Sequence, residues 1–140
     1  MDLITARTEM RLQTGPDTFR PVKAELSYSP SDPYAVRCLF PDEASPVSWA
    51  FARELLAMGL FTGSGDGDVH IEPVDRHRVH LAFSDGRGAG VALLQASARD
   101  LVGFLVHTYE AVPLGSEDRH VDWDTCIGLL LDRGYGSTTP

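Results

Sequence analysis

Residues 4–13 have the sequence Ile-Thr-Ala-Arg-Thr-Glu-Met-Arg-Leu-Gln, in which the even positions suit a buried face and the odd positions are polar. This period of two predicts a β-strand with one face buried and one face in solvent. Gly15, Pro16 and Asp17 then mark a turn. Residues 22–29 repeat the alternation, which predicts a second strand pairing back on the first. An antiparallel sheet is therefore where the fold begins.

The rest of the first half continues the same plan. A turn-forming segment over residues 29–33 precedes a third strand at residues 34–40. Residues 47–51 predict a short fourth strand, and a helix follows over about residues 52–58, ended by Gly59.

The second half repeats this order. Residues 62–68 are rich in glycine and predict a flexible connection, and strands are expected over residues 69–74, 79–83 and 91–93. A long helix is expected after Ser97, whose side chain caps it, with Asp100 completing a start that resembles a capping box. Its apolar positions recur at helical spacing: Ala98, Leu101, Val102, Leu105, Val106, Tyr109 and Val112.

The end of the chain predicts a third piece. Residues 112–120 are expected to be a loop, and Asp122 then caps a short helix. Its apolar side chains fall at i, i+3, i+4, i+7 and i+8: Trp123, Cys126, Ile127, Leu130 and Leu131. We interpret residues 1–140 as one domain of the α+β class. It is expected to have antiparallel β-sheet with helices on one side, built as two strands-then-helix halves plus a C-terminal helix.

Charge and composition exclude several classes of protein. The 140 residues include 20 acidic and 12 basic side chains, for a formal charge of -8. That excess argues against binding to nucleic acid, which requires clustered positive charge. The start of the chain has no apolar run typical of a signal peptide, and no stretch approaches the ~18 apolar residues of a membrane span. Cys38 and Cys126 are expected to be buried free thiols in a reducing cytoplasm.

The search for reactive groups assigns no catalytic, cofactor-binding or metal-binding residue. The five histidines are scattered at positions without a convergent ligand set: His70, His77, His80, His107 and His120. No G-x-S-x-G motif occurs, and neither cysteine has an obvious base beside it. Numerous acids, Glu43, Glu54 and Glu117 among them, single out no pair.

Three other groups of residues have a structural and a functional interpretation. The glycine-rich stretches at residues 63–67 and 86–90 lack the G-K-[ST] of a phosphate loop and are better interpreted as turns. The basic cluster at residues 76–80 is either a polar hairpin end or a patch for an acidic partner. Large aromatic residues are expected mainly in the core: Trp49, Phe51, Phe83, Phe104 and Tyr109.

Four stretches, taken together, resemble the SsgA-like family of actinomycete sporulation and cell-division regulators. They are Asp-Pro-Tyr-Ala-Val-Arg at 32–37, Trp-Ala-Phe-Ala-Arg-Glu-Leu-Leu-Ala-Met-Gly-Leu at 49–60, Gly-Asp-Gly-Asp-Val at 65–69, and Arg-His-Val-Asp-Trp-Asp at 119–124. The resemblance covers nearly the whole chain. We expect most motif positions to maintain the fold and the packing of the trimer, with Arg37, Arg53 and Glu54 forming ion pairs.

The resemblance implies a non-enzymatic role without a cofactor. It implies a whirly-like fold assembled as a homo-oligomer, most simply a homotrimer, in the cytoplasm at the cell septum. The implied partners are the tubulin-like division protein FtsZ and an SsgA-type paralogue, and the compact length favours the septum-recruiting, SsgB-type branch. The alternative is a single-stranded nucleic-acid-binding module, because whirly-like folds bind such strands, and an uncharacterised hydrolase ranks last.

Overall fold

The computed structural model describes residues 3–43, 48–84 and 91–120, and the structural statements below refer to these residues. The first half contains β1 (Ile4–Gly15), β2 (Thr18–Tyr28), β3 (Ala35–Leu39), β4 (Ser48–Ala52) and α1 (Arg53–Gly59). The second half contains β5 (Ser64–Asp66), β6 (Val69–Pro73), β7 (Arg78–Ser84), β8 (Val91–Ser97) and α2 (Ala98–Ala111), followed by a 3-10 helix (Glu117–His120). The protein is thus of the α+β class, and the strands-then-helix order occurs twice as predicted.

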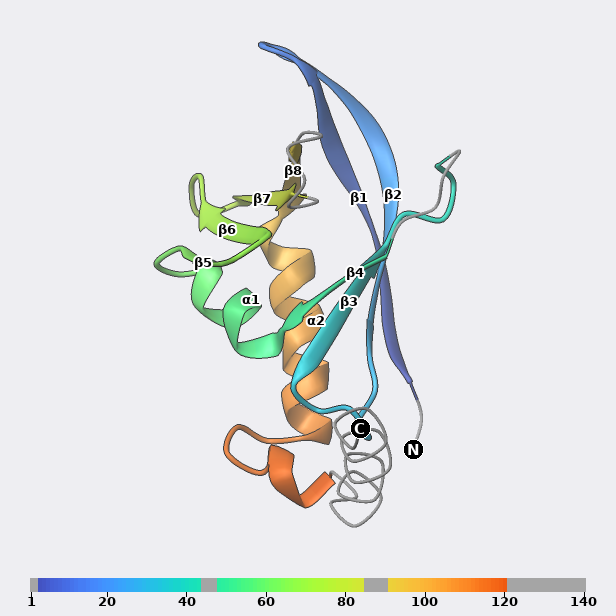
Figure 1. Ribbon diagram of the computed structural model, residues 1–140, viewed down its shortest axis with the longest axis vertical. Coiled ribbons are helices and arrows are strands. Elements are labelled where there is room, and N and C mark those ends of the chain that lie inside the picture. The colour runs from blue at the N-terminus through green and yellow to red at the C-terminus, as the bar shows by residue number, and fades with distance from the viewer. Residues whose placement is uncertain (1–2, 44–47, 85–90, 121–140) are drawn as a thin grey trace, which may run out of the picture.

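The strands form one curled antiparallel sheet. Their order across it is β4-β3-β2-β1-β8-β7-β6-β5, and Figure 1 shows the sheet curving around α2. β1 and β8 join the two halves at the centre through the pairs Arg11–Gln95 and Leu12–Leu94. Each half is therefore a four-stranded meander, because neighbours in sequence are neighbours in the sheet.

The core lies on the inner side of this curve. Met10 of β1 and Leu26 of β2 are fully buried, as the alternation predicted. The curl brings Trp49 of β4 against Phe83 of β7, with their rings stacked at 5.1 Å between centroids. Phe40 and Phe51 contact the same Phe83 ring. The two halves therefore share one core although their strands lie far apart in the sheet.

The cap of α2 agrees with the sequence-based prediction, and so does most of its buried stripe, since Leu101, Leu105 and Val112 are buried. The Ser97 hydroxyl accepts a hydrogen bond from the backbone N–H of Asp100 at 3.2 Å, while Thr8 Oγ1 donates to the Asp100 carboxylate at 2.6 Å. Val102 and Val106, expected on the apolar face, are 41% and 50% exposed. The buried side of the helix includes Phe104 and Thr108 in their place, which lie beside Leu101 and Leu105.

Some segments differ from the sequence-based prediction. Residues 62–68 include β5, which pairs with β6, and Ser64 Oγ donates to the Leu55 carbonyl at 2.6 Å. β2 begins at Thr18, four residues early, because the turn at Pro16 and Asp17 is tight enough for Gly15 to pair with Thr18. Within 112–120, expected to be loop, residues 117–120 are helical. The helix predicted after Asp122 and the turn at 86–90 lie outside the described residues.

Cys38 is a buried free thiol, as predicted. Burial raises its pKa to about 12. Cys126 lies outside the described residues. No helix in the described parts of the chain is long and apolar enough to cross a membrane.

Candidate functional site: the Arg53 cluster and the outer faces of the sheet

Arg53 is the most unusual charged residue in the described structure, because its side chain is only 3% exposed. It is the first residue of α1, directly after β4. Its backbone N–H donates to the Tyr34 carbonyl at 2.8 Å. This bond extends the pairing of β3 with β4 by one residue. Arg53 therefore continues the alternation of β4, and its side chain lies on the same inner face as that of Phe51.

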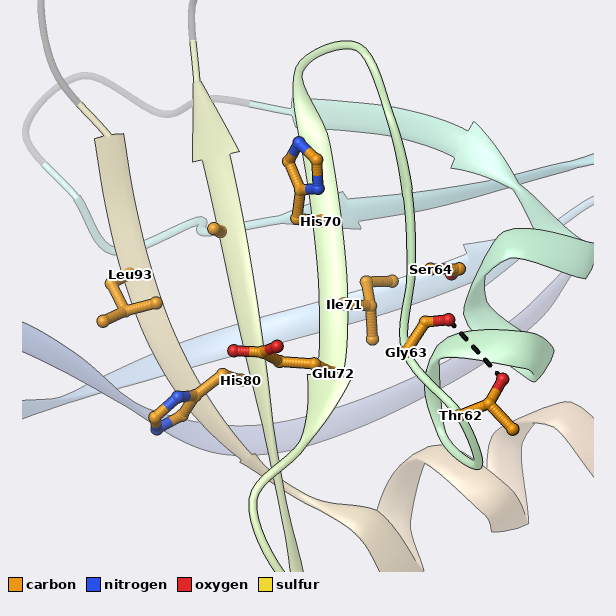
Figure 2. Close-up of a pocket in the computed structure, with 9 residues that line it drawn as sticks. Thr62, Gly63, Ser64, His70, Ile71, Glu72, His80 and Leu93 are labelled. Carbon is orange, nitrogen blue, oxygen red and sulfur yellow. Dashed lines mark hydrogen bonds between the residues drawn. The ribbon is translucent and has the colours of Figure 1, made fainter.

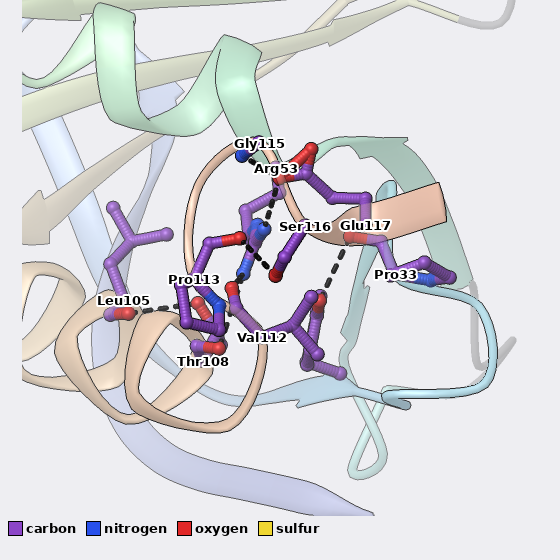
Figure 3. A network of polar contacts seen from close by, with 10 residues as sticks. Pro33, Arg53, Leu105, Thr108, Val112, Pro113, Gly115, Ser116 and Glu117 are labelled. Atoms are coloured by element: carbon purple, nitrogen blue, oxygen red, sulfur yellow. Dashed lines mark hydrogen bonds and ion pairs between the residues drawn. The ribbon is translucent and has the colours of Figure 1, made fainter. Parts of the chain in front are cut away.

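The guanidinium group has partners on all sides (Figure 3). Nη1 donates to the carbonyls of Thr108 at 3.1 Å and Val112 at 2.8 Å. These carbonyls belong to the C-terminal end of α2, where the helix dipole favours a cation. Nη2 donates to the Glu117 carboxylate at 3.1 Å, and the same Glu117 oxygen accepts from the Gly115 N–H at 2.7 Å.

Two tyrosines enclose the cation. The central carbon of the Arg53 guanidinium lies 5.0 Å from the ring centroid of Tyr28 and 4.1 Å from that of Tyr109. Tyr28 also donates its hydroxyl proton to the Pro33 carbonyl at 2.9 Å. Burial raises the pKa of both phenols, with the nearby Arg53 charge opposing the shift. Both rings therefore stay neutral and offer their faces to the cation.

The contacts of the cluster hold distant segments of the chain together. The guanidinium makes three hydrogen bonds, two to carbonyls and one to a carboxylate, and no buried side-chain nitrogen or oxygen in the described residues lacks a hydrogen bond. It joins four segments: the turn before β3, the start of α1, the end of α2 and the 3-10 helix. The resemblance motifs at 32–37 and 49–60 therefore meet here, in the structural role expected of them.

Glu117 is the residue that the sequence analysis missed. It was grouped with other unremarkable acids, although Arg53 was expected in an ion pair. The two residues are 64 positions apart, and no local pattern links them. The sequence of one protein alone contains no pattern that predicts such a long-range buried ion pair. Glu54, also expected in an ion pair, is exposed and has no ion-pair partner among the described residues.

A second candidate lies on the outer face of β6, β7 and β8 (Figure 2), where His70, His80 and Leu93 help to line a hollow of about 500 Å³. Glu72 of β6 is directly opposite His80 of β7, and Gln95 Nε2 lies 3.5 Å from His80 Nε2. His70 lies further along β6. No group of three metal-ligating side chains converges in the described part of the chain, so we assign no ligand to this hollow.

The outer face of the first half has matched charges. Arg7 pairs with Glu25 at 3.7 Å and Lys23 with Asp42 at 3.8 Å. Arg37 lies 3.9 Å from Asp32, which confirms that Arg37 forms an ion pair. These pairs place a carboxylate beside each of the three cations, an arrangement that does not favour nucleic-acid binding.

The basic cluster at residues 76–80 forms a polar hairpin end. Asp75 accepts hydrogen bonds from the N–H groups of His77 at 2.8 Å and Arg78 at 2.9 Å. Its carboxylate also pairs with the Arg78 side chain at 3.0 Å. These bonds lower the pKa of Asp75, with the His77 N–H as the largest cause. Of the two interpretations, the structure supports the hairpin end.

Comparison with known proteins decides the family. The model of a family described as Streptomyces sporulation and cell division protein SsgA matches residues 22–117. The chain belongs to the SsgA family. The match includes Tyr28, Arg53, Tyr109 and Glu117, the residues that build the buried cluster. For this SsgA-family chain, the resemblance stated from the sequence is confirmed.

Curated relatives and solved structures extend the match over most of the chain. It is 42% identical to the sporulation-specific cell division protein SsgB of Salinispora tropica, covering 91% of this chain and 92% of that protein. The SsgB protein of Streptomyces coelicolor is also 42% identical, over 91% and 95% of the two chains. The crystal structure of an SsgA-like protein from Thermobifida fusca superimposes with a TM-score of 0.80 at 38% identity, covering 91% and 94%.

Proposed function

We propose that this chain acts in sporulation-specific cell division, as a non-catalytic protein of the SsgB type that helps to position or recruit FtsZ at septum sites. One observation carries the proposal. The chain is 42% identical to relatives named sporulation-specific cell division protein SsgB, over about nine-tenths of both partners. Agreement over that length leaves no room for a different domain in the matched region.

The non-catalytic part of the proposal is supported by the site. The almost fully buried guanidinium of Arg53 donates hydrogen bonds to two carbonyls and a carboxylate and lies against two tyrosine rings. His70 and His80 lie at the hollow on the outer face of β6 and β7, where no group of three metal-ligating side chains converges among the described residues. We therefore look for the activity of the protein in its surfaces and its partners.

The proposal includes assembly. We propose a homo-oligomer, a trimer, that contacts an SsgA-type paralogue as well as FtsZ and lies in the cytoplasm at the septum. Light scattering coupled to gel filtration tests the assembly, with three times the monomer mass as the expected value. A monomer at all concentrations would remove the trimer from the proposal.

A fluorescent fusion tests the proposed role most simply. The fusion replaces the native gene in the source organism, and its position is followed through sporulation with and without depletion of FtsZ. We expect rings or ladders of fusion protein before FtsZ gathers, and loss of sporulation septa in the deletion strain. A diffuse fusion together with normal septa in the deletion strain would contradict the role.

The alternative, binding to single-stranded nucleic acid, makes a different prediction. It requires binding of an oligonucleotide that weakens as salt rises, because released counterions drive such binding. With a formal charge of -8, we expect no such binding to a thirty-nucleotide oligothymidine at micromolar protein. Tight, salt-dependent binding would favour the alternative.

A further inference from the structure

β4 forms one edge of the sheet and has backbone groups that nothing in the described structure pairs. It pairs with β3 on one side, and no strand follows it on the other. In an antiparallel pair, residues that exchange hydrogen bonds alternate with residues that do not. Arg53 donates its backbone N–H to the Tyr34 carbonyl. The backbone N–H groups of Phe51 and Trp49, two and four residues earlier, therefore also point toward β3. The N–H groups of Ser48, Ala50 and Ala52 therefore point away from the sheet.

Among the described residues, β4 itself lacks the features that usually protect a sheet edge. Sheet edges are commonly blocked by charged side chains, proline, bulges or very short strands. β4 has the sequence Ser-Trp-Ala-Phe-Ala and pairs with β3 in unbroken register. Its outward side chains, those of Ser48, Ala50 and Ala52, are exposed and small. The opposite edge, β5, is by contrast only three residues long.

A hollow of about 380 Å³ lies against the unprotected edge. β4 forms one wall, and residues 67–69 form the other. Leu55 and Val69 give the hollow an apolar floor, and Asp68 provides an exposed carboxylate at its rim. The hollow offers backbone pairing on one side and space for side chains on the other.

We propose that the free edge of β4 binds an extended, basic segment of a partner protein, which adds to the sheet as a further strand. Strand addition uses main-chain hydrogen bonds for affinity and pockets under alternate side chains for specificity. The small outward side chains at positions 48, 50 and 52 leave room for bulky residues on the incoming strand. The inference does not depend on the identity of the partner, so it stands or falls separately from the recruitment of FtsZ.

Charge favours a basic segment over a second copy of this chain. Asp68 lies at the rim, and the whole chain carries a formal charge of -8. A second copy would bring the same excess of negative charge to the edge, whereas lysine or arginine would meet it with the opposite sign. Complementary charge raises the rate of association and disfavours wrong partners.

Amide hydrogen exchange measured by NMR tests the edge residue by residue. In the free protein, we expect the N–H groups of Trp49, Phe51 and Arg53 to exchange slowly and those of Ser48, Ala50 and Ala52 to exchange fast. The probe is the capped peptide Lys-Val-Lys-Val-Lys-Val-Lys. At saturation it should slow the three fast amides at least about tenfold while leaving the other three unchanged.

Three comparisons separate strand pairing from simple attraction of charge. The peptide Glu-Val-Glu-Val-Glu-Val-Glu should bind at least about tenfold more weakly. The peptide Lys-Val-Lys-Pro-Lys-Val-Lys keeps the charge but cannot complete the ladder, so it should fail to protect the amides. Asp68→Asn should weaken the binding of the basic peptide without altering exchange in the free protein.

Variants of Ala50 test the edge itself. Ala50→Pro removes an N–H that faces away from β3, so the fold should survive while peptide binding is lost. Ala50→Lys is a second variant that places a charge on the edge and should also lose binding. Ala82→Lys is the matched control, because Ala82 also faces outward but its strand, β7, is paired on both sides.

Several results would overturn the proposal. Slow exchange of Ser48, Ala50 and Ala52 in dilute free protein would mean that another part of the chain already covers the edge. Protection that grows with protein concentration in the absence of peptide would identify a second copy as the occupant. Unchanged peptide binding in both Ala50 variants would place the peptide elsewhere.

Discussion

At the scale of single residues, Arg53 accounts for how distant segments are held together. Its side chain is buried with Glu117 as its counter-charge among the described residues, and its other partners there are carbonyls and rings. A buried cation needs such compensation, because removing it from water is costly. The cluster therefore stabilises the fold provided that every partner is present.

Replacement of Arg53 by methionine tests this statement. The change keeps an unbranched side chain but leaves Glu117 and the carbonyls at the end of α2 without their donor. We expect a loss of about 3 kcal/mol in the free energy of unfolding, measured by urea denaturation. Glu54→Gln, at the exposed neighbouring position, is the control and should change stability by less than about 0.5 kcal/mol. Equal stability of both variants and the wild type would show that the cluster is incidental.

Burial of Cys38 makes the free energy of unfolding fall as the pH rises into the alkaline range. Burial raises its pKa from 9.0 to about 12, so the unfolded chain loses this proton first as the pH rises. The contribution of the thiol is complete below pH 9 and is lost between pH 9 and 12, with a slope approaching about 1.4 kcal/mol per pH unit. We expect Cys38→Ala to show a shallower decline than the wild type in urea denaturation between pH 8 and 10.5. Parallel declines would contradict the burial of this thiol.

Some residues were predictable and others were not. The alternation of residues 34–40 was enough to predict that Cys38 is buried. No local pattern predicted the ion pair between Arg53 and Glu117, because this contact depends on how α2 crosses the sheet. Tyr34 illustrates the limit of local pattern: it continues the alternation of the third strand but is 50% exposed, because β3 begins only at Ala35.

At the scale of elements, sequence periodicity predicted strands better than connections. Long alternating stretches became β1 and β2 almost as expected, since one face of each is buried. β5 was missed because Ser64–Asp66 is short and bounded by Gly63 and Gly67, both with positive φ. Its strand geometry is imposed by pairing with β6 rather than by its own composition. In α2 the prediction was wrong only for Val102 and Val106, which are apolar but face solvent.

Two glycines in helices make a matched pair for testing helix packing. A Cβ added to Gly59 at the end of α1 would lie 2.5 Å from the Ile71 Cβ, whereas one added to Gly103 in α2 would meet nothing within 4 Å. We expect Gly59→Ala to lower the free energy of unfolding by about 1–3 kcal/mol through overpacking. Gly103→Ala should raise it by about 0.5–1 kcal/mol, because alanine favours the helix.

Thermal and urea unfolding of the two variants check this pair. Effects of opposite sign are expected, with Gly103→Ala retaining the wild-type spectrum. Stabilisation by both substitutions would mean that α1 does not pack closely on β6. Destabilisation by both would mean that the outward side of α2 is covered.

At the scale of the whole molecule, the curl of the sheet brings the two similar halves together so that they share one hydrophobic core. Phe83 of β7 is the point of contact, since the rings of Trp49 and Phe51 from β4 and of Phe40 all pack against it. The sequence predicted both halves and the repeated order of elements. It did not predict that β1 and β8 pair at the centre, because a repeated pattern leaves the join between its copies unspecified.

Truncation of Phe83 tests the shared core. Phe83→Ala should cost about 3–5 kcal/mol of unfolding free energy and should loosen both halves together in hydrogen exchange. Phe61→Ala removes a ring that is 76% exposed and should change stability by less than about 0.5 kcal/mol. Loss of protection confined to β6–β8 would contradict a single core.

The role proposed for this member of the SsgA family is contact with the division machinery rather than catalysis. Co-sedimentation with FtsZ from the same organism tests it most directly, with purified proteins at a fixed FtsZ concentration and a rising concentration of this chain. We predict that the chain enters the pellet with polymerised FtsZ up to a fixed ratio and stays in the supernatant without polymer. A chain that remains in the supernatant at every ratio would contradict the claim.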